Sequence, residues 1–279
     1  MNQYQGGPAR ARVRIPPRLL IAGVIAVVAI LGYFGKTSLN PVTGKKQHIS
    51  LSPQQEVAIG LQSAPEMIRQ MGGEHPDPDA QRLVDTVGAK LVAVLPAEPT
   101  PYPYEFHLLA DAKTVNAFAL PGGQVFITAA LLSRLETEGQ LAGVLGHEIG
   151  HVIGRHSAER MAKAELTQGL VQAVGVAGSD GSGPNTAAQL ATMVGNFINL
   201  KYGREDELES DKLGLRFMHD AGYDPRAMIG VMEILEKASG GSSQPEFAST
   251  HPNPGNRVER IKEHLAQMFP QGIPDGLTK

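Results

Sequence analysis

The stretch Leu141–Ser157, LAGVLGHEIGHVIGRHS, carries the pattern H-E-x-x-H at His147, Glu148 and His151. Two residues four apart on an α-helix lie on one face at neighbouring heights, so both imidazoles can bind one metal ion. Glu148 then lies beside the metal, where it can take a proton from a zinc-bound water. A helix with two ordinary histidines can match this pattern by chance, but the apolar residues around it favour the buried helix that a zinc site needs. A third ligand is still required.

Composition limits what that site can be. The chain has 279 residues, 42% of them hydrophobic, enough for one substantial domain or two small ones. It has no cysteine, so disulfides and thiolate ligands are excluded and zinc must use histidine and carboxylate groups. The net charge of −3 gives no indication of a nucleic-acid partner.

A second feature is the apolar run Leu19–Phe34, LLIAGVIAVVAILGYF, which has no charged side chain. It lies near the short end of the length of about 17–25 residues that crosses a bilayer as a helix. The residues before it are basic and include Arg10, Arg12, Arg14 and Arg18. We therefore expect an uncleaved membrane anchor rather than a core helix; a cleaved signal peptide, which would leave a secreted or periplasmic protein, is the alternative.

Charges on the two sides of this run predict its orientation. Four arginines precede it, whereas Lys36, Lys45 and Lys46 follow it, which favours a cytoplasmic N-terminus and a periplasmic or other extracytoplasmic domain. The expected organisation is a basic segment (1–18), a transmembrane anchor (19–35), a linker (36–50), a catalytic domain (51–270) and a tail (271–279).

The remainder predicts an α+β fold, mainly helical with a small sheet. Helices are expected near 52–71, 77–95, 138–176, 186–200, 203–221, 224–239 and 256–268, and strands at 104–109, 115–120 and 124–128. Pro121-Gly122-Gly123 suits a tight turn between the last two strands. The Gly/Ser-rich loop 178–184 is a candidate cover for the site.

Two places could supply the third ligand. His156 is one residue too early for H-E-x-x-H-x-x-G-x-x-H, and on a continuous helix it points about 140° away from His151. We expect it to be a polar partner on the helix surface. In the acidic stretch 204–211, REDELESD, Glu207 and Asp211 share a helix face, so one can bind zinc while the other accepts a histidine N–H. Spacing alone equally fits a solvated acidic face, which is what we expect of Glu205, Asp206 and Glu209.

Resemblance to a known family separates these alternatives. HEIGH followed by Glu207-Leu208-Glu209-Ser210-Asp211 resembles the zinc endopeptidases of the CAAX prenyl protease and heat-shock membrane protease family, which are gluzincins with a zincin-like domain. Residues 116–123, NAFALPGG, resemble the hairpin that precedes the motif in that family. Thr250-His251-Pro252 with Arg257 resembles its His-Pro…Arg element. The likeness spans Ser52–Met268, and a single anchor is most similar to the periplasmic or Oma-type quality-control branch.

The resemblance implies a zinc-dependent endopeptidase that cleaves unfolded or misassembled proteins in membrane or envelope quality control. One Zn²⁺ per chain would be held by His147, His151 and Glu207, with Asp211 behind a ligating histidine and Ser210 in place of a small alanine. Glu148 would be the general base. His251 and Arg257 would approach the site to stabilise an oxyanion, or His251 would occupy the open zinc position in a resting form.

The sequence also predicts partners. The strand Asn116, Ala117, Phe118 and Ala119 would pair with an extended polypeptide substrate, and the N-terminal helix would contact the lipid bilayer. The sequence leaves the oligomeric state open. The rival hypothesis is a membrane-tethered chaperone or assembly factor with an idle or regulated zinc site, against which the presence of Glu148 counts. An intramembrane protease is disfavoured because Glu138, Arg155 and His156 lie close to the motif.

Overall fold

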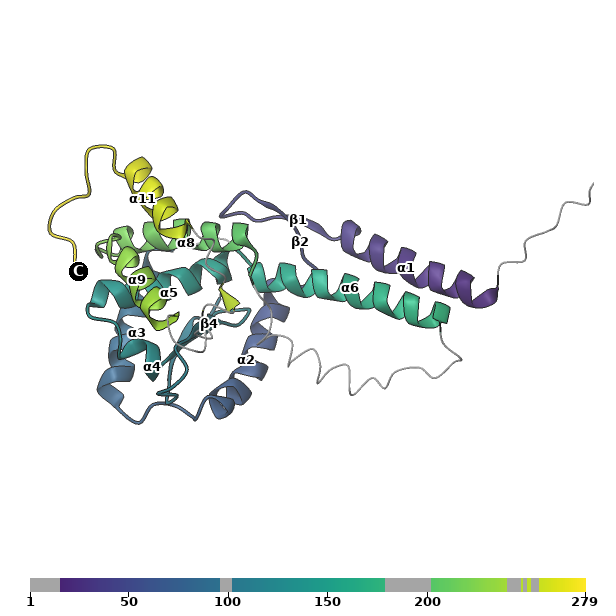
Figure 1. Cartoon of the computed structure of the whole chain (residues 1–279), viewed down its shortest axis with the longest axis horizontal. Helices are drawn as coiled ribbons and strands as arrows, with labels where there is room; N and C mark the ends of the chain where they lie inside the picture. Colours follow the sequence, from purple (N-terminus) through teal and green to yellow (C-terminus); the bar gives the residue numbers. More distant parts are fainter. Residues whose placement is uncertain (1–15, 96–101, 179–201, 240–246, 248–249, 252–255) are drawn as a thin grey trace, which may run out of the picture.

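The computed structural model describes residues 16–95, 102–178, 202–239, 247, 250–251 and 256–279 (Figure 1). The helices are α1 Pro17–Gly35, α2 Pro53–Gln70, α3 Pro78–Ala93, α4 Ala129–Leu132, α5 Glu138–Ile153, α6 His156–Gly178, α8 Arg204–Asp220, α9 Ala227–Ser239 and α11 Arg257–Met268. The strands are β1 Thr37–Leu39, β2 Lys46–His48, β3 Glu105–Leu109, β4 Ala117–Ala119 and β5 Gln124–Thr128. The mainly helical α+β prediction is confirmed. Predictions for residues 1–15, 179–201, 240–243 and Pro252 lie outside the described residues.

Local sequence signals fix several of these boundaries. Ser52 begins α2 with the predicted capping box: its hydroxyl accepts the Gln55 backbone N–H at 3.3 Å, and the Gln55 side chain accepts the Ser52 N–H at 2.8 Å. Helix α1 coincides with the predicted anchor and is the one helix among the described residues that is long and apolar enough to cross a membrane.

The sheet of three strands has the order β3-β5-β4, with β5 parallel to β3 and antiparallel to β4. Strand β4 therefore forms one edge. Gly122 and Gly123, in the turn before β5, have φ angles of 83° and 105°, as predicted for a turn that only glycine adopts without strain. A side chain at Gly122 would also clash with the backbone of Val57 in α2. The turn thus fixes the edge strand against the helical layer.

Helix α5 is the centre of the core, and every residue from Gly139 to Ile153 is buried. It packs against α8, α3, α9 and β4. Its apolar residues join those of α8 and β5 in one cluster, which includes Leu145, Ile149 and Phe217. A helix buried on all sides holds its polar residues, including the H-E-x-x-H group, in fixed positions away from bulk water.

Helices α5 and α8 approach each other closely at Gly150. A Cβ atom there would lie 2.9 Å from the Cα and the carbonyl oxygen of Ser210, whereas a Cβ at Gly143 would have no neighbour closer than 3.5 Å. A small residue at position 210 fits the same contact, which accounts for serine being tolerated where the family pattern has alanine.

We expect Gly150→Ala to lower the free energy of unfolding by about 1–3 kcal/mol, because backbone atoms on both helices must move apart. Gly143→Ala, in the same helix, should be neutral or stabilising by up to about 1 kcal/mol through helix propensity. Urea unfolding of both variants checks this. Equal effects of the two substitutions would contradict the close approach.

The structure corrects the expected linker at 36–50. Strands β1 and β2 form an antiparallel hairpin whose buried polar residues bind the end of the motif helix. Asn40 donates its amide to the carbonyl oxygen of Ile153 at 2.9 Å, and Gln47 donates to that of Gly154 at 2.6 Å. These bonds satisfy carbonyl groups that a helix end leaves unpaired. Short polar strands gave no periodic signal, so the sequence did not predict them.

Two further differences concern chain breaks and ends. The predicted continuous helix through 138–176 is interrupted after Ile153, where Arg155 has a φ angle of 53° and donates to Glu56 at 2.9 Å. The C-terminal tail is not free: the Asp224 N–H donates to the Thr278 carbonyl at 2.7 Å, and the Thr278 N–H donates to Gly222 at 2.9 Å. The tail is therefore tied to the turn between α8 and α9.

Candidate metal centre

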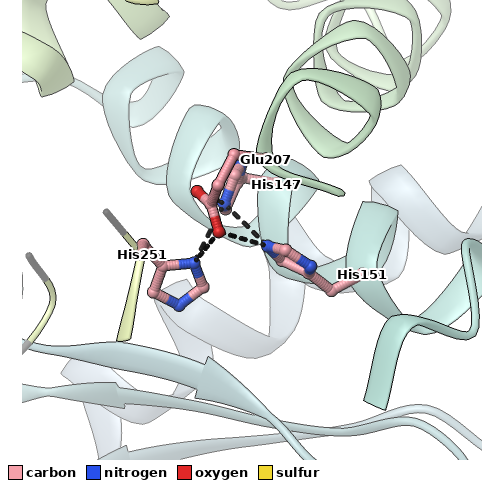
Figure 2. A group of neighbouring side chains, drawn as sticks. All are labelled: His147, His151, Glu207 and His251. Atoms are coloured by element: carbon pink, nitrogen blue, oxygen red, sulfur yellow. Dashed lines mark hydrogen bonds and ion pairs between the residues drawn. The ribbon is translucent and has the colours of Figure 1, made fainter. Parts of the chain in front are cut away.

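Three segments bring four potential metal ligands together. Helix α5 supplies His147 and His151, α8 supplies Glu207, and His251 enters from the segment before α11 (Figure 2). One ligand atom from each lies within 4.8 Å of all the others, and all four residues are buried. Figure 2 shows the two imidazoles of α5, the carboxylate and the His251 ring pointing toward one common point.

The spacing of these atoms suits a tetrahedral zinc ion. The Nε2 atoms of His147 and His151 are 3.0 Å apart, and they lie 3.4 and 3.5 Å from the oxygens of Glu207. Nδ1 of His251 lies 3.3 Å from His147 Nε2 and 3.1 Å from Glu207 Oε1. Zinc–ligand bonds of about 2.0–2.1 Å in a tetrahedron separate ligands by about 3.3 Å. The donor set of three imidazoles and a carboxylate therefore fits zinc.

Asp211 and Arg257 form the layer behind His147. Asp211 Oδ1 lies 2.9 Å from His147 Nδ1, so a proton on Nδ1 leaves Nε2 free for metal, as expected from the sequence. Arg257 donates to the two Asp211 oxygens at 2.6 and 2.7 Å and contacts Glu207 Oε2 at 3.2 Å. Its guanidinium is occupied by these carboxylates. Arg257 thus approaches the site from behind its ligands, and the oxyanion role that we expected of it stays a prediction.

His156 occupies a different place from the one predicted. Because α5 ends before it, its ring is buried rather than on a helix surface, and its Nδ1 lies 2.9 Å from His151 Nδ1. Nε2 of His156 contacts Glu209 at 2.8 Å, and Glu209 also pairs with Lys45 at 3.6 Å. His156 thus stands behind His151 much as Asp211 stands behind His147.

The acidic stretch is correspondingly less solvated than we expected. Glu205 is exposed, as predicted, but Asp206 is buried, accepts the Gly203 N–H at 3.0 Å at the start of α8 and pairs with Lys45 at 3.5 Å. Glu209 is the partner of His156. A run of acidic residues does not reveal which carboxylates face a neighbouring element. Separating the buried carboxylates from the exposed one therefore required the three-dimensional structure.

Two aromatic residues at the site had no signal in the sequence. The Tyr202 ring stacks on His151 with centroids 3.8 Å apart, and its hydroxyl is hydrogen bonded to Ser157 at 2.9 Å. Phe247 stacks on His251 with centroids 4.4 Å apart. Both come from segments far from the motif in sequence and hold the imidazole rings in fixed planes.

Glu148 differs from its neighbours because its carboxylate is fully buried and neither oxygen has a hydrogen-bond partner among the described residues. Burial raises its pKa above the ordinary value. Such an unsatisfied group is costly unless a ligand or a water contacts it. The imidazole of His251 lies beside it, with Nε2 3.6 Å from Oε1. The carboxylate is therefore available to a group that enters beside the metal position.

Charge in the cluster also affects the histidines. Burial and the Arg257 charge lower the pKa of His147, but hydrogen bonds to Asp211 and Glu207 outweigh them and raise it to about 9. Burial holds the pKa of His151 well below its ordinary value. Burial raises the pKa of Glu207, but the surrounding histidines hold it well below normal. A metal that binds His147 must displace its proton, so metal binding is coupled to pH.

The predicted substrate strand lies next to this centre. The Thr128 N–H donates to the Asn116 carbonyl at 3.0 Å and the Leu120 N–H to Gln124 at 2.8 Å, so these residues face β5. By the alternation of an antiparallel pair, the peptide groups of Ala117 and Ala119 point away from β5, although both residues are buried. A small pocket beside β4 is lined by Met67, Met71, Asn116, Phe118, Ala119, Leu120, Ser157, Arg160, Tyr202, Thr250 and His251.

This combination defines a class of protein: a mainly helical domain in which H-E-x-x-H on one helix and a glutamate on a second surround one metal position, as in metal-dependent peptidases. Residues 78–265 match the family described as Peptidase family M48. The match covers well over half of the chain, and the chain belongs to this metallopeptidase family.

Relatives agree with the family assignment. The chain is 32% identical over 265 residues to the beta-barrel assembly-enhancing protease of Yersinia pestis, covering 90% of this chain and 52% of that protein. It is 30% identical over 268 residues to the protein of that name from Escherichia coli (strain K12), covering 91% and 53%. It is 31% identical over 242 residues to the mitochondrial metalloendopeptidase OMA1 of Schizosaccharomyces pombe, covering 84% and 68%.

The chain spans about half the length of these two bacterial relatives. The predicted resemblance is thus confirmed for the family, whereas the prenyl protease name belongs to a different branch of it than these relatives.

Proposed function

We propose that this chain is a zinc-dependent endopeptidase that cleaves unfolded or misassembled polypeptides at a membrane. The observation that carries the proposal is the buried, hydrogen-bond-free carboxylate of Glu148 beside three groups, His147, His151 and Glu207, that fit zinc. A structural zinc site has no use for such a carboxylate. One zinc per chain is the expected content.

Each group at the site has a separate role in the proposed reaction. Zinc, when bound, supplies a Lewis acid that polarises the scissile carbonyl and acidifies water. Glu148 takes the proton of the attacking water and passes it to the leaving amine. Asp211 holds the His147 ring in the tautomer that binds metal. Arg257 fixes Asp211 by two hydrogen bonds and Glu207 by an ion pair.

His251 would close the site in a resting form. Its Nδ1 stands where a fourth ligand belongs, 3.1–3.3 Å from the ligand atoms of Glu207 and His147, and its Nε2 lies 3.6 Å from Glu148. Water and substrate need that same space. We therefore assign His251 a gating role, with Phe247 holding its ring.

Removing this side chain tests the gate. If His251 keeps about nine-tenths of the molecules closed, His251→Ala should raise the rate of peptide cleavage about tenfold. His219→Ala, at the far end of α8, is the control and should leave the rate unchanged. A strong fall in activity for His251→Ala would show instead that the imidazole assists the reaction.

Substrate recognition is proposed to use the edge of β4. The peptide groups of Ala117 and Ala119 point away from β5 but are buried, so that side of the strand must open before they pair with an extended chain. Such pairing reads backbone rather than side chains. The neighbouring pocket, with Met67 and Met71, would accept an apolar side chain. This mode requires a segment without folded structure and thus suits quality control. The bacterial relatives are named for enhancing beta-barrel assembly, a process in which unfolded segments are present.

The proposed localisation is at a membrane. Helix α1 would anchor the chain in the bilayer, with the N-terminus in the cytoplasm and the domain of 51–270 on the periplasmic or other extracytoplasmic side. Support comes from the arginine-rich residues before α1 and from the assembly-enhancing and mitochondrial proteases among the relatives. Within the family, we propose that the chain belongs to the single-anchor branch.

Casein degradation distinguishes the enzyme from a membrane-tethered chaperone with an idle zinc site. The purified chain should fragment unfolded casein, and 1,10-phenanthroline should abolish the fragmentation. A chaperone would suppress casein aggregation with no fragments, with or without the chelator. That second outcome would overturn the proposal.

A further inference from the structure

The C-terminal half of α6 leaves the catalytic domain and lies alongside α1 (Figure 1). From Leu166 to Gly178 it has no charged side chain. Large apolar side chains on it point outward: Leu170 is 37% exposed, Val171 64% and Val174 74%. Nothing among the described residues covers them. Exposing such an apolar surface to water is unfavourable in free energy, and large exposed apolar patches usually mark an interaction site.

Between α1 and α6 the small side chains are buried and large ones are exposed, the opposite of what two helices packed in water show. Small residues form the contact: Ala22 and Ala173 are buried, and a Cβ at Gly169 would lie 2.7 Å from that of Ala29. On α1, the large side chains Val28 and Leu31 are more than 60% exposed. In water the large apolar groups would be buried between the helices, whereas in lipid small residues allow close approach and large ones face the acyl chains.

Polar and aromatic groups lie at the end of the α1–α6 pair that is nearest the domain. Glu165 on α6 is hydrogen bonded to Ser50 at 3.2 Å, at the end of the pair nearest the domain. Tyr33 of α1 stacks on His48 of the β-hairpin with ring centroids 4.6 Å apart. Tyrosine is enriched at membrane–water interfaces, and a charged residue such as Glu165 also belongs on the water side. The uncharged part of α6 begins one residue after this level.

We propose that residues Leu166–Gly178 of α6 lie within the lipid bilayer beside α1. This rests on the proposed insertion of α1 but goes beyond it, since a second element then enters the membrane. The occupant is lipid, because the exposed face is uncharged and continuous with that of the candidate anchor.

The consequence concerns the metal centre. Helix α6 begins at His156, whose ring contacts the ligand His151. Ten residues at 1.5 Å each place the start of the embedded part about 15 Å from that point. An extended chain covers this distance in about four or five residues. The site is thus set to reach polypeptide segments that emerge close to the bilayer surface.

The absence of cysteine permits a direct test. Single variants Val171→Cys and Val174→Cys of the full chain are labelled with bimane and reconstituted into phosphatidylcholine–phosphatidylglycerol vesicles. Ala164→Cys, exposed on the same helix before Glu165, is the matched control, and Val28→Cys is the reference in α1. Fluorescence is quenched either by lipids with nitroxides on their acyl chains or by aqueous iodide.

We expect lipid nitroxides to quench positions 171 and 174 as strongly as position 28, and iodide to quench only position 164. Iodide quenching at positions 171 and 174, together with lipid quenching at position 28, would refute the insertion of α6 and leave the insertion of α1 standing. Protection from both quenchers would indicate a second copy of the chain on this face and would also refute the insertion of α6. Iodide quenching at all positions would refute the anchor as well. None of these readouts depends on zinc or on cleavage, so a failure of the peptidase proposal is recognised separately.

Discussion

Glu148→Gln should lower the rate of casein cleavage by about 10²- to 10⁴-fold while leaving one zinc per chain, because general acid–base catalysis contributes about that much. The amide has nearly the same shape but cannot take a proton from water. The metal should remain because Glu148 is not among the proposed ligands, which are His147, His151 and Glu207. Cleavage is measured by release of soluble peptides, and metal by elemental analysis of the same preparation.

Glu138→Gln is the matched control on the same helix, since Glu138 begins α5 and pairs with Lys90 at 3.1 Å, away from the metal position. It should retain full activity. A Glu148→Gln protein that cleaves casein like the unaltered chain would refute the assignment of the base. Loss of zinc together with activity would instead make Glu148 a ligand.

Glu207→Ala should produce the largest loss of metal. Replacing even the partners behind a ligand costs about 10- to 100-fold in metal affinity, so removal of an anionic ligand itself should cost at least about 100-fold. Glu207 is completely buried among the histidines, and its low pKa keeps it ionised for metal binding. Zinc content after dialysis against a competing chelator measures the effect.

Glu205→Ala is the control, because Glu205 lies on the exposed side of the same helix turn. Its zinc content should equal that of the unaltered chain. Glu207→Gln keeps the side-chain volume and should also lose zinc, which separates a lost ligand from a lost fold. Equal zinc content in the Glu205→Ala and Glu207→Ala proteins would show that the third ligand is another residue.

Much of the fold could be predicted because it depends on local sequence patterns. The capping box at Ser52, the glycine turn at 122–123 and the apolar spacing of α5 each act within a few residues. The strands β3 and β5 likewise showed their short apolar runs. Pattern recognition therefore placed most helices and the three-stranded sheet within a few residues of their observed ends.

What escaped prediction depends on contacts between distant segments. Whether His156 was a surface residue or a partner of His151 depended on a break at Arg155, which is held by Glu56 almost one hundred residues earlier. The short strand containing Gln47 has no apolar pattern because its buried residue serves the end of α5. Tyr202 has no motif around it and reaches the site only through tertiary packing.

The proposed function requires that cleavage depend on one zinc ion per chain. Metal-free protein, prepared with a chelator and then freed of it, is titrated with Zn²⁺ while casein cleavage is followed. We predict that activity is absent at the start, rises linearly and reaches a plateau at one zinc per chain. This is expected from the one cluster of potential ligands found among the described residues, His147, His151, Glu207 and His251. Full cleavage by the metal-free protein, or no cleavage at any zinc concentration, would contradict the central claim.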